Sequence, residues 1–67
     1  MIVVFSNYSD NKEFLVNIYN VNTIEEWGDG NGELVITFSN GHQKFVKGFI
    51  KVIQTKMSAT ETKNDIH

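Results

Sequence analysis

Residues 34–47 read Leu-Val-Ile-Thr-Phe-Ser-Asn-Gly-His-Gln-Lys-Phe-Val-Lys and contain the clearest structural signal in the chain. Apolar residues alternate over residues 34–39, so one face of a predicted strand carries Leu34, Ile36 and Phe38. Asn40-Gly41 follows, a pair typical of a two-residue type I′ turn. The chain is therefore expected to return along residues 42–47 as an antiparallel strand.

Three further strands are predicted on the N-terminal side of this hairpin. Short runs rich in β-branched and aromatic residues, at positions 2–8, 13–19 and 23–27, are separated by clusters of Asn, Gly, Asp and Ser. Residues 9–12 have the composition of a turn. Residues 28–32 contain three glycines, which permit positive φ and predict a mobile hairpin loop.

The C-terminal part of the chain is ambiguous. Apolar residues at positions 49, 50, 53 and 57 fit one face of a helix, but the run is also rich in β-branched residues. We expect a strand over residues 49–57, with a short helix as the alternative, because only Gly48 is available as an N-cap. Residues 58–67 are polar and aperiodic, which predicts a flexible tail after one β domain over residues 1–57.

Five or six short strands in so few residues should close on themselves, because an open sheet would leave edges and one face exposed. The predicted fold is mainly β, a small five- to six-stranded antiparallel SH3-like barrel. A core of this size seldom contributes more than about 3–5 kcal/mol, so assembly into a homo-oligomer is a reasonable expectation. The predicted core comprises Val4, Phe14, Val16, Ile18, Ile24, Leu34, Ile36, Phe38, Phe45 and Ile53.

Length and composition exclude several classes of function. A chain of 67 residues is too short for a two-domain enzyme, and without cysteine it has no disulfide or thiolate metal site. All six basic residues are lysines, which removes the bidentate arginine contacts used for phosphate and guanine. No secretory or membrane-spanning segment is recognisable, so we expect a cytoplasmic protein without a membrane partner.

The residues needed for catalysis are also scarce. His42 beside Ser39 would form a dyad without an orienting group or a pocket, and His67 is the last residue. Residues 29–33 place oxygen ligands at alternate positions, but they do not match the spacing of a calcium-binding loop. We therefore expect a protein that is not an enzyme and that holds no cofactor and no metal.

Charge is distributed unevenly behind a net value of -2. Carboxylates but no lysines occur in residues 13–33, whereas lysines but no carboxylates occur in residues 34–60. Such segregation can attract a charged partner. Trp27, beside the glycine-rich loop, and Tyr19, at the end of a strand, are residue types favoured at interaction hot spots, although Trp27 could instead fill the end of the barrel.

These features predict two alternative binding surfaces. The acidic and aromatic surface would suit a basic protein partner, and the adjacent carboxylates within it should point to opposite faces of their strand. Its predicted partner-binding residues are Tyr19, Glu25, Glu26, Trp27, Asp29 and Glu33. The lysine-rich half could instead contact a nucleotide or a nucleic-acid backbone. The residues of this alternative site are Lys44, Lys47 and Lys51.

Two stretches of the chain resemble the FlbD/SwrD family of small proteins, which are encoded among bacterial flagellar genes. One runs from Val16-Asn17 to Glu25-Glu26, and the other runs from Val35 through Asn40-Gly41 to Lys47. Together they cover about half of the chain. In that family the second stretch is a strand, a turn and a strand. The resemblance implies a small interaction protein without enzymatic activity and with no defined catalytic residues.

The sequence therefore predicts a non-enzymatic small binding protein that acts on another macromolecule, in the first instance a protein. Small size, an acidic surface and a composition typical of AT-rich genes favour a phage-encoded inhibitor of a bacterial host or defence protein. The first alternative is a FlbD/SwrD-like accessory protein of flagellar motility. The second alternative is a small barrel that sequesters a nucleotide or binds single-stranded nucleic acid.

Overall fold

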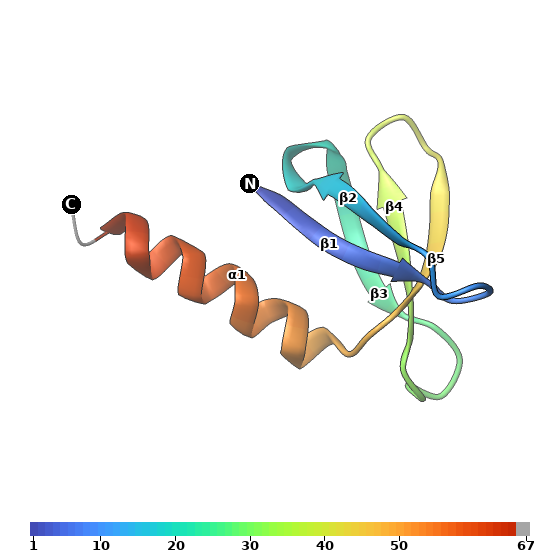
Figure 1. The fold of residues 1–67 in the computed structure, drawn as a ribbon. Helices are drawn as coiled ribbons and strands as arrows, with labels where there is room; N and C mark the ends of the chain where they lie inside the picture. The colour runs from blue at the N-terminus through green and yellow to red at the C-terminus, as the bar shows by residue number, and fades with distance from the viewer. Residues whose placement is uncertain (66–67) are drawn as a thin grey trace.

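The computed structural model describes the backbone of residues 1–65 and the side chains of residues 1–57. Five antiparallel strands form one sheet, and a C-terminal helix follows them (Figure 1). The elements are β1 (Ile2–Asn7), β2 (Glu13–Asn17), the 3-10 helix η1 (Ile18–Asn20), β3 (Val21–Glu26), β4 (Glu33–Phe38), β5 (Gln43–Lys47) and α1 (Ile50–Asp65). The prediction of a mainly β fold is confirmed.

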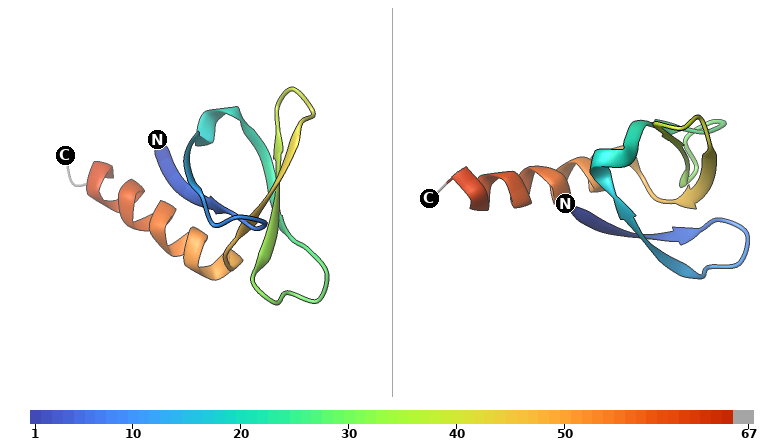
Figure 2. Two further views of the ribbon diagram at one scale, coloured as in Figure 1. Left: turned by 45° about the vertical axis from the view of Figure 1, so that its right-hand side comes forward. Right: turned by 90° about the horizontal axis from the view of Figure 1, so that it is seen from above.

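The sheet is not closed, so the predicted closed barrel is wrong. Its strand order is β2-β1-β5-β4-β3, which leaves β2 and β3 as the two edges. The side chain of Asn17 accepts a hydrogen bond from the Tyr19 backbone N–H (3.1 Å), and η1 turns the chain between these edges. Because β1 pairs with β5 through Ser6 and Asn7 at its C-terminal end, the β1–β2 hairpin is joined to the rest of the sheet at one end (Figure 2).

One face of the sheet, the inner face, packs against the first turns of α1 and forms the core. Leu34 and Ile36 on β4 and Val46 on β5 have no exposed surface. The other buried members of this cluster are Phe5, Val16 and Ile53, with Val3, Phe14, Ile18, Val21, Ile24, Phe38, Ile50 and Met57 packed around them. The predicted faces of β2 and β4 are confirmed, but Val4 and Phe45 were wrongly placed in the core.

The error at Phe45 comes from the turn between β4 and β5. Gly41 has a φ of +88°, but Asn40 does not have positive φ, so the turn is not the predicted type I′. Phe38 and His42 close a three-residue loop, in which the Phe38 N–H donates to the His42 carbonyl (2.8 Å). This loop is one residue longer than predicted, so every side chain of β5 changes face and Val46 replaces Phe45 in the core.

The error at Val4 has a different cause. Residues 2–5 are all apolar, so their sequence contains no alternation that would mark one face. In the structure Phe5 pairs with Phe14 and Val3 pairs with Val16, and these positions share the inner face. Val4 therefore points outward and is 48% exposed.

The segment after β5 is a helix, so the strand expected over residues 49–57 is wrong and the alternative is correct. The Phe49 carbonyl accepts hydrogen bonds from the N–H groups of Val52 and Ile53 and so begins the helix. The helical spacing brings Ile50, Ile53 and Met57 against the core.

The helix also extends farther than its apolar positions would suggest. The sequence predicts a flexible polar tail over residues 58–67, but the backbone continues as helix to Asp65. Flexibility of residues 58–65 stays a prediction, and residues 66–67 lie outside the described part of the chain.

Candidate binding surface

The outer face of β3, β4 and β5 carries a cluster of large apolar side chains that we call the aromatic face. It consists of Val35 on β4, Phe45 on β5, Trp27 directly after β3 and Tyr8 directly after β1. Val35 lies directly opposite Phe45, and the Tyr8 N–H donates to the Phe45 carbonyl at 3.1 Å, which extends the β1–β5 pairing by one residue. The strand register therefore aligns these three residues in one row across the sheet.

The side chains of Trp27 and Phe45 contact each other above β4, the strand between them. Their ring centroids are 5.1 Å apart with an interplanar angle of 74°, an edge-to-face arrangement that aromatic pairs favour. They come from opposite sides of β4, whose two neighbouring strands lie about 9.5 Å apart, so the rings must reach over that strand. This explains why Val35 is only 4% exposed although it points away from the core.

The aromatic side chains remain accessible. Trp27 is 51% exposed, Tyr8 45% and Phe45 39%. A hydrogen bond from the backbone N–H of Trp27 to the Glu33 carbonyl (3.0 Å) fixes the backbone at the start of the glycine-rich loop. The site therefore presents apolar surface on an ordered sheet, which limits the conformational entropy lost when a partner binds.

Charged residues border the aromatic face. Glu25 lies opposite Val35, and Glu33 lies opposite Lys47 on the neighbouring strand. Asp29 lies in the adjoining loop, where its carboxylate accepts a hydrogen bond from the Asn31 amide (2.8 Å). The border is predominantly acidic, as the sequence predicted, but it includes one lysine.

Two of the predicted partner-binding residues lie away from this cluster. Tyr19 is 82% exposed in η1, and the whole of β3, about 20 Å long, separates it from Trp27. Glu26 pairs with Leu34 on the inner side of the sheet, whereas Glu25 pairs with Val35 on the outer side. The prediction that the adjacent carboxylates point to opposite faces is confirmed.

The glycine-rich loop has the backbone that its composition predicts. Gly28, Gly30 and Gly32 have φ values of +67°, +77° and +93°, which favour glycine strongly. The side chains of residues 1–57 contain no group of three or more His, Asp or Glu arranged to hold a metal ion.

The three lysines of the alternative site do not gather. Lys44 pairs with Ile36 on the inner side, and its ammonium lies 4.7 Å from the centre of the Phe14 ring. Lys47 is on the outer side opposite Glu33, and Lys51 is exposed on α1. A phosphate group could not contact Lys44 and Lys47 from one side of the sheet.

Ser39 and His42 do not form a hydrogen-bonded dyad over the described residues, because each has another partner. The Ser39 hydroxyl donates to the carbonyl of Asn20 (3.1 Å), and His42 is exposed in the adjacent turn, its N–H bonded to the side chain of Asn40 (3.0 Å). The hydroxyl proton is thus directed at a backbone oxygen. His67 lies outside the described residues.

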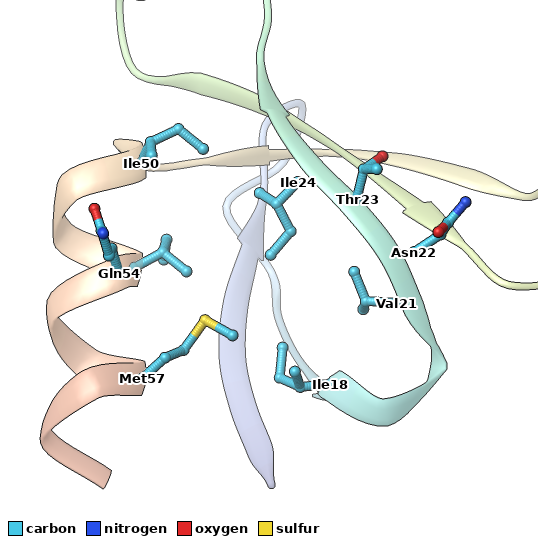
Figure 3. Close-up of a pocket in the computed structure, with 9 residues that line it drawn as sticks. Ile18, Val21, Asn22, Thr23, Ile24, Ile50, Gln54 and Met57 are labelled. Carbon is cyan, nitrogen blue, oxygen red and sulfur yellow. The ribbon is translucent and has the colours of Figure 1, made fainter. Parts of the chain in front are cut away.

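An apolar groove of about 290 Å³ lies between α1 and β3 (Figure 3). Ile18, Val21 and Ile24 line it on one side, and Ile50, Ile53 and Met57 line it on the other. These residues also belong to or border the core, so the groove marks the place where α1 covers the open side of the sheet incompletely.

Sequence reasoning missed Phe45 and Tyr8 as members of the surface. Phe45 was assigned to the core through the wrong turn length, and nothing in the sequence placed Tyr8 beside it. The adjacent pair Phe45-Val46 could have given a signal, because two large apolar neighbours on a strand must occupy both faces.

Comparisons with protein families, with curated proteins and with solved structures gave no match. The resemblance to the FlbD/SwrD family therefore stays a prediction. Over residues 1–65 the structure has no helix that is long and apolar enough to span a membrane.

Proposed function

We propose that this protein is a non-enzymatic binding protein that recognises another protein through the aromatic face. The observation that carries the proposal is the half-exposed edge-to-face pair of Trp27 and Phe45 above a buried Val35. Tryptophan and tyrosine dominate the binding energy of many protein interfaces because they bury a large area at low entropic cost.

The charge around the aromatic face supports a basic partner surface. Glu25, Glu33 and Asp29 outnumber Lys47 along its border. Charges at the rim of an interface mainly affect association rate and specificity, whereas the aromatic centre contributes most of the affinity. The partner would therefore place apolar side chains on the rings and lysine or arginine around them.

The test is affinity capture from the native host followed by measurements on the purified partner. Trp27→Ala should weaken binding by at least about tenfold, as expected for a hot-spot residue. Tyr19→Ala is the matched control, because it removes an aromatic side chain that is even more exposed at the far end of β3. Isothermal titration of both variants against the partner that the wild type captures gives the comparison.

The charge prediction has its own variants. Glu25→Lys should slow association and make it less dependent on salt, because the border then carries as many basic as acidic residues. Lys47→Glu should leave binding intact or strengthen it. The proposal is wrong if Trp27→Ala binds like the wild type while Tyr19→Ala or Lys47→Glu abolishes capture.

The identity of the partner follows from the same capture experiment. A bacterial host or defence protein would support the phage-inhibitor version, and a flagellar component would support the FlbD/SwrD-like version. Both versions use the same surface and differ only in what it contacts.

A second candidate function is binding of single-stranded nucleic acid. It is favoured by Tyr8, Trp27 and Phe45, whose exposed rings on one sheet face could stack with bases, and by Lys47 beside them. This function predicts steep weakening of binding with added salt. Fluorescence anisotropy with a labelled single-stranded oligonucleotide at increasing salt distinguishes it from protein binding.

A further inference from the structure

The two edges of the sheet are protected to different degrees. β3 has an irregular register between Val21 and Thr23, carries Glu25 and Glu26, and packs against α1. Bulges, charges and covering elements are the features that keep edge strands from pairing with other chains. β2 pairs with β1 in continuous register from Glu13 to Asn17, and Glu13, its first residue, is its one charged residue.

The free edge of β2 presents backbone groups at three positions. The Asn7 N–H donates to the Lys12 carbonyl (2.9 Å), and the Ile18 N–H donates to the Met1 carbonyl (3.0 Å). Hydrogen-bonded pairs alternate along an antiparallel ladder, so Val16 and Phe14 also bond to β1. The N–H and C=O groups of Glu13 and Leu15 and the N–H of Asn17 therefore point away from the sheet, whereas the Asn17 carbonyl accepts the first hydrogen bond of η1.

The side chains of the same edge form an exposed aliphatic surface. Leu15 is 69% exposed and lies directly opposite Val4, which is 48% exposed. Ile2, one step along the same face of β1, is 58% exposed. Water thus contacts a row of branched side chains beside an unpaired strand edge, an arrangement that favours addition of another strand.

We propose that β2 pairs with β2 of a second copy of this chain, antiparallel and centred on Leu15. A two-fold axis at Leu15 places Leu15 opposite Leu15 and Glu13 opposite Asn17 of the second copy. This is the two-fold register that brings all three outward-pointing residues of each strand opposite one another, with Leu15 making both of its hydrogen bonds to the second copy and the Asn17 N–H donating to the Glu13 carbonyl. The two sheets become one continuous sheet, and the exposed leucines cover each other.

The polar residues at the ends of this interface are complementary. The side-chain oxygen of Asn17 already accepts a hydrogen bond from the Tyr19 N–H, so its amide N–H groups are directed elsewhere. Glu13 of the second copy brings a carboxylate to this position, which can accept from that amide. The strand therefore matches a copy of itself without placing like charges opposite each other.

The dimer is independent of the aromatic face. Phe45 lies on β5 and Trp27 directly after β3, whereas β2 is at the other edge of the sheet. Tyr8, the remaining ring of the aromatic face, lies in the β1–β2 turn and not on β2. A failure of the dimer test would not affect the binding test on Trp27, and a failure of the binding test would not affect the dimer.

Sedimentation analysis over a range of protein concentrations tests the proposal on the full chain. The wild type should show a reversible dimer, and Leu15→Lys should raise the dissociation constant by at least about tenfold, because it removes apolar contact and places two lysines opposite each other. Thr23→Lys on the β3 edge is the matched control and should dimerise like the wild type. Circular dichroism checks that each variant is folded.

Disulfide trapping tests the register, since the chain has no cysteine of its own. The α-carbons of a hydrogen-bonded pair are about 5.5 Å apart, which a disulfide can bridge. Leu15→Cys should form a covalent dimer on mild oxidation. Glu13→Cys, on the same edge, should not, because the two introduced thiols would lie roughly 13 Å apart along the strands.

The proposal is overturned if the wild type sediments as a monomer up to about 1 mM, where even a weak association is detectable. It is also overturned if Leu15→Lys dimerises as well as the wild type, or if Glu13→Cys cross-links as fast as Leu15→Cys.

Discussion

Val35 and Ile36 are neighbours on β4 and both are almost wholly buried, but different parts of the molecule cover them. Ile36 faces the core, where β1, β2, β5 and α1 surround it. Val35 faces outward and is covered by the rings of Trp27 and Phe45. Burial on the inner face thus depends on the whole fold, whereas burial on the outer face depends on two side chains that a partner can also contact.

The largest loss of stability is expected from a substitution on the inner face of the sheet. Ile36→Ala should lower the free energy of unfolding by about 2–5 kcal/mol, because it leaves a cavity in a site with no exposed surface. In so small a domain this change should leave much of the protein unfolded at 25 °C. Urea denaturation followed by circular dichroism measures it, with Thr37→Ala on the outer side of β4 as control. A loss below about 1 kcal/mol would mean that the core is not packed as described.

A smaller loss of stability is expected from a substitution of Val35, the residue before Ile36 on β4. Val35→Ala removes two methyl groups and should cost about 1.5 kcal/mol. Combining it with Trp27→Ala should cost less than the sum of the two single changes, because the indole is part of what buries Val35. A double-mutant cycle in urea measures the coupling. Strict additivity would show that Trp27 does not cover Val35.

The smallest effect is expected where a charge meets an aromatic ring at the margin of the core. Lys44→Met keeps most of the aliphatic chain but removes the ammonium 4.7 Å from the Phe14 ring centre. The expected loss is about 0.5 kcal/mol, typical of an exposed cation–π contact. Lys51→Met, at an exposed position on α1, is the matched control. The measurement is the difference in urea midpoint between the two variants.

The same comparison shows how far the sequence could predict the structure. The strands, and the residues of β4 that face the core, could be predicted from the pattern of apolar residues within each strand, which requires no knowledge of the other strands. The face of β5 depended on the length of the turn at residues 39–41, and adding a single residue exchanged Phe45 for Val46. The hydrogen bonds that choose between a two-residue and a three-residue loop involve both strands, so neither strand's sequence determines the choice.

The binding surface could be predicted only in part for a related reason. Trp27 was identified because its residue type is characteristic of interfaces, and Glu25 and Glu33 because they lie near it in sequence. Tyr19 is predicted as part of the surface from its residue type, but the length of β3 places it about 20 Å from Trp27. The contact between Trp27 and Phe45 joins residues from two strands that are not neighbours, so only the assembled sheet brings them together.

The attachment of β1 to β5 through two residue pairs also affects the order in which the chain folds. The β1–β2 hairpin is synthesised first, yet Phe5 and Val16 are covered only once Leu34, Ile36 and Val46 have left the ribosome. An isolated two-stranded hairpin is at best marginally stable, whereas β3, β4 and β5 form a three-stranded antiparallel unit by themselves. We expect the β1–β2 hairpin to remain unfolded during synthesis until β4 and β5 provide the apolar residues against which Phe5 and Val16 pack.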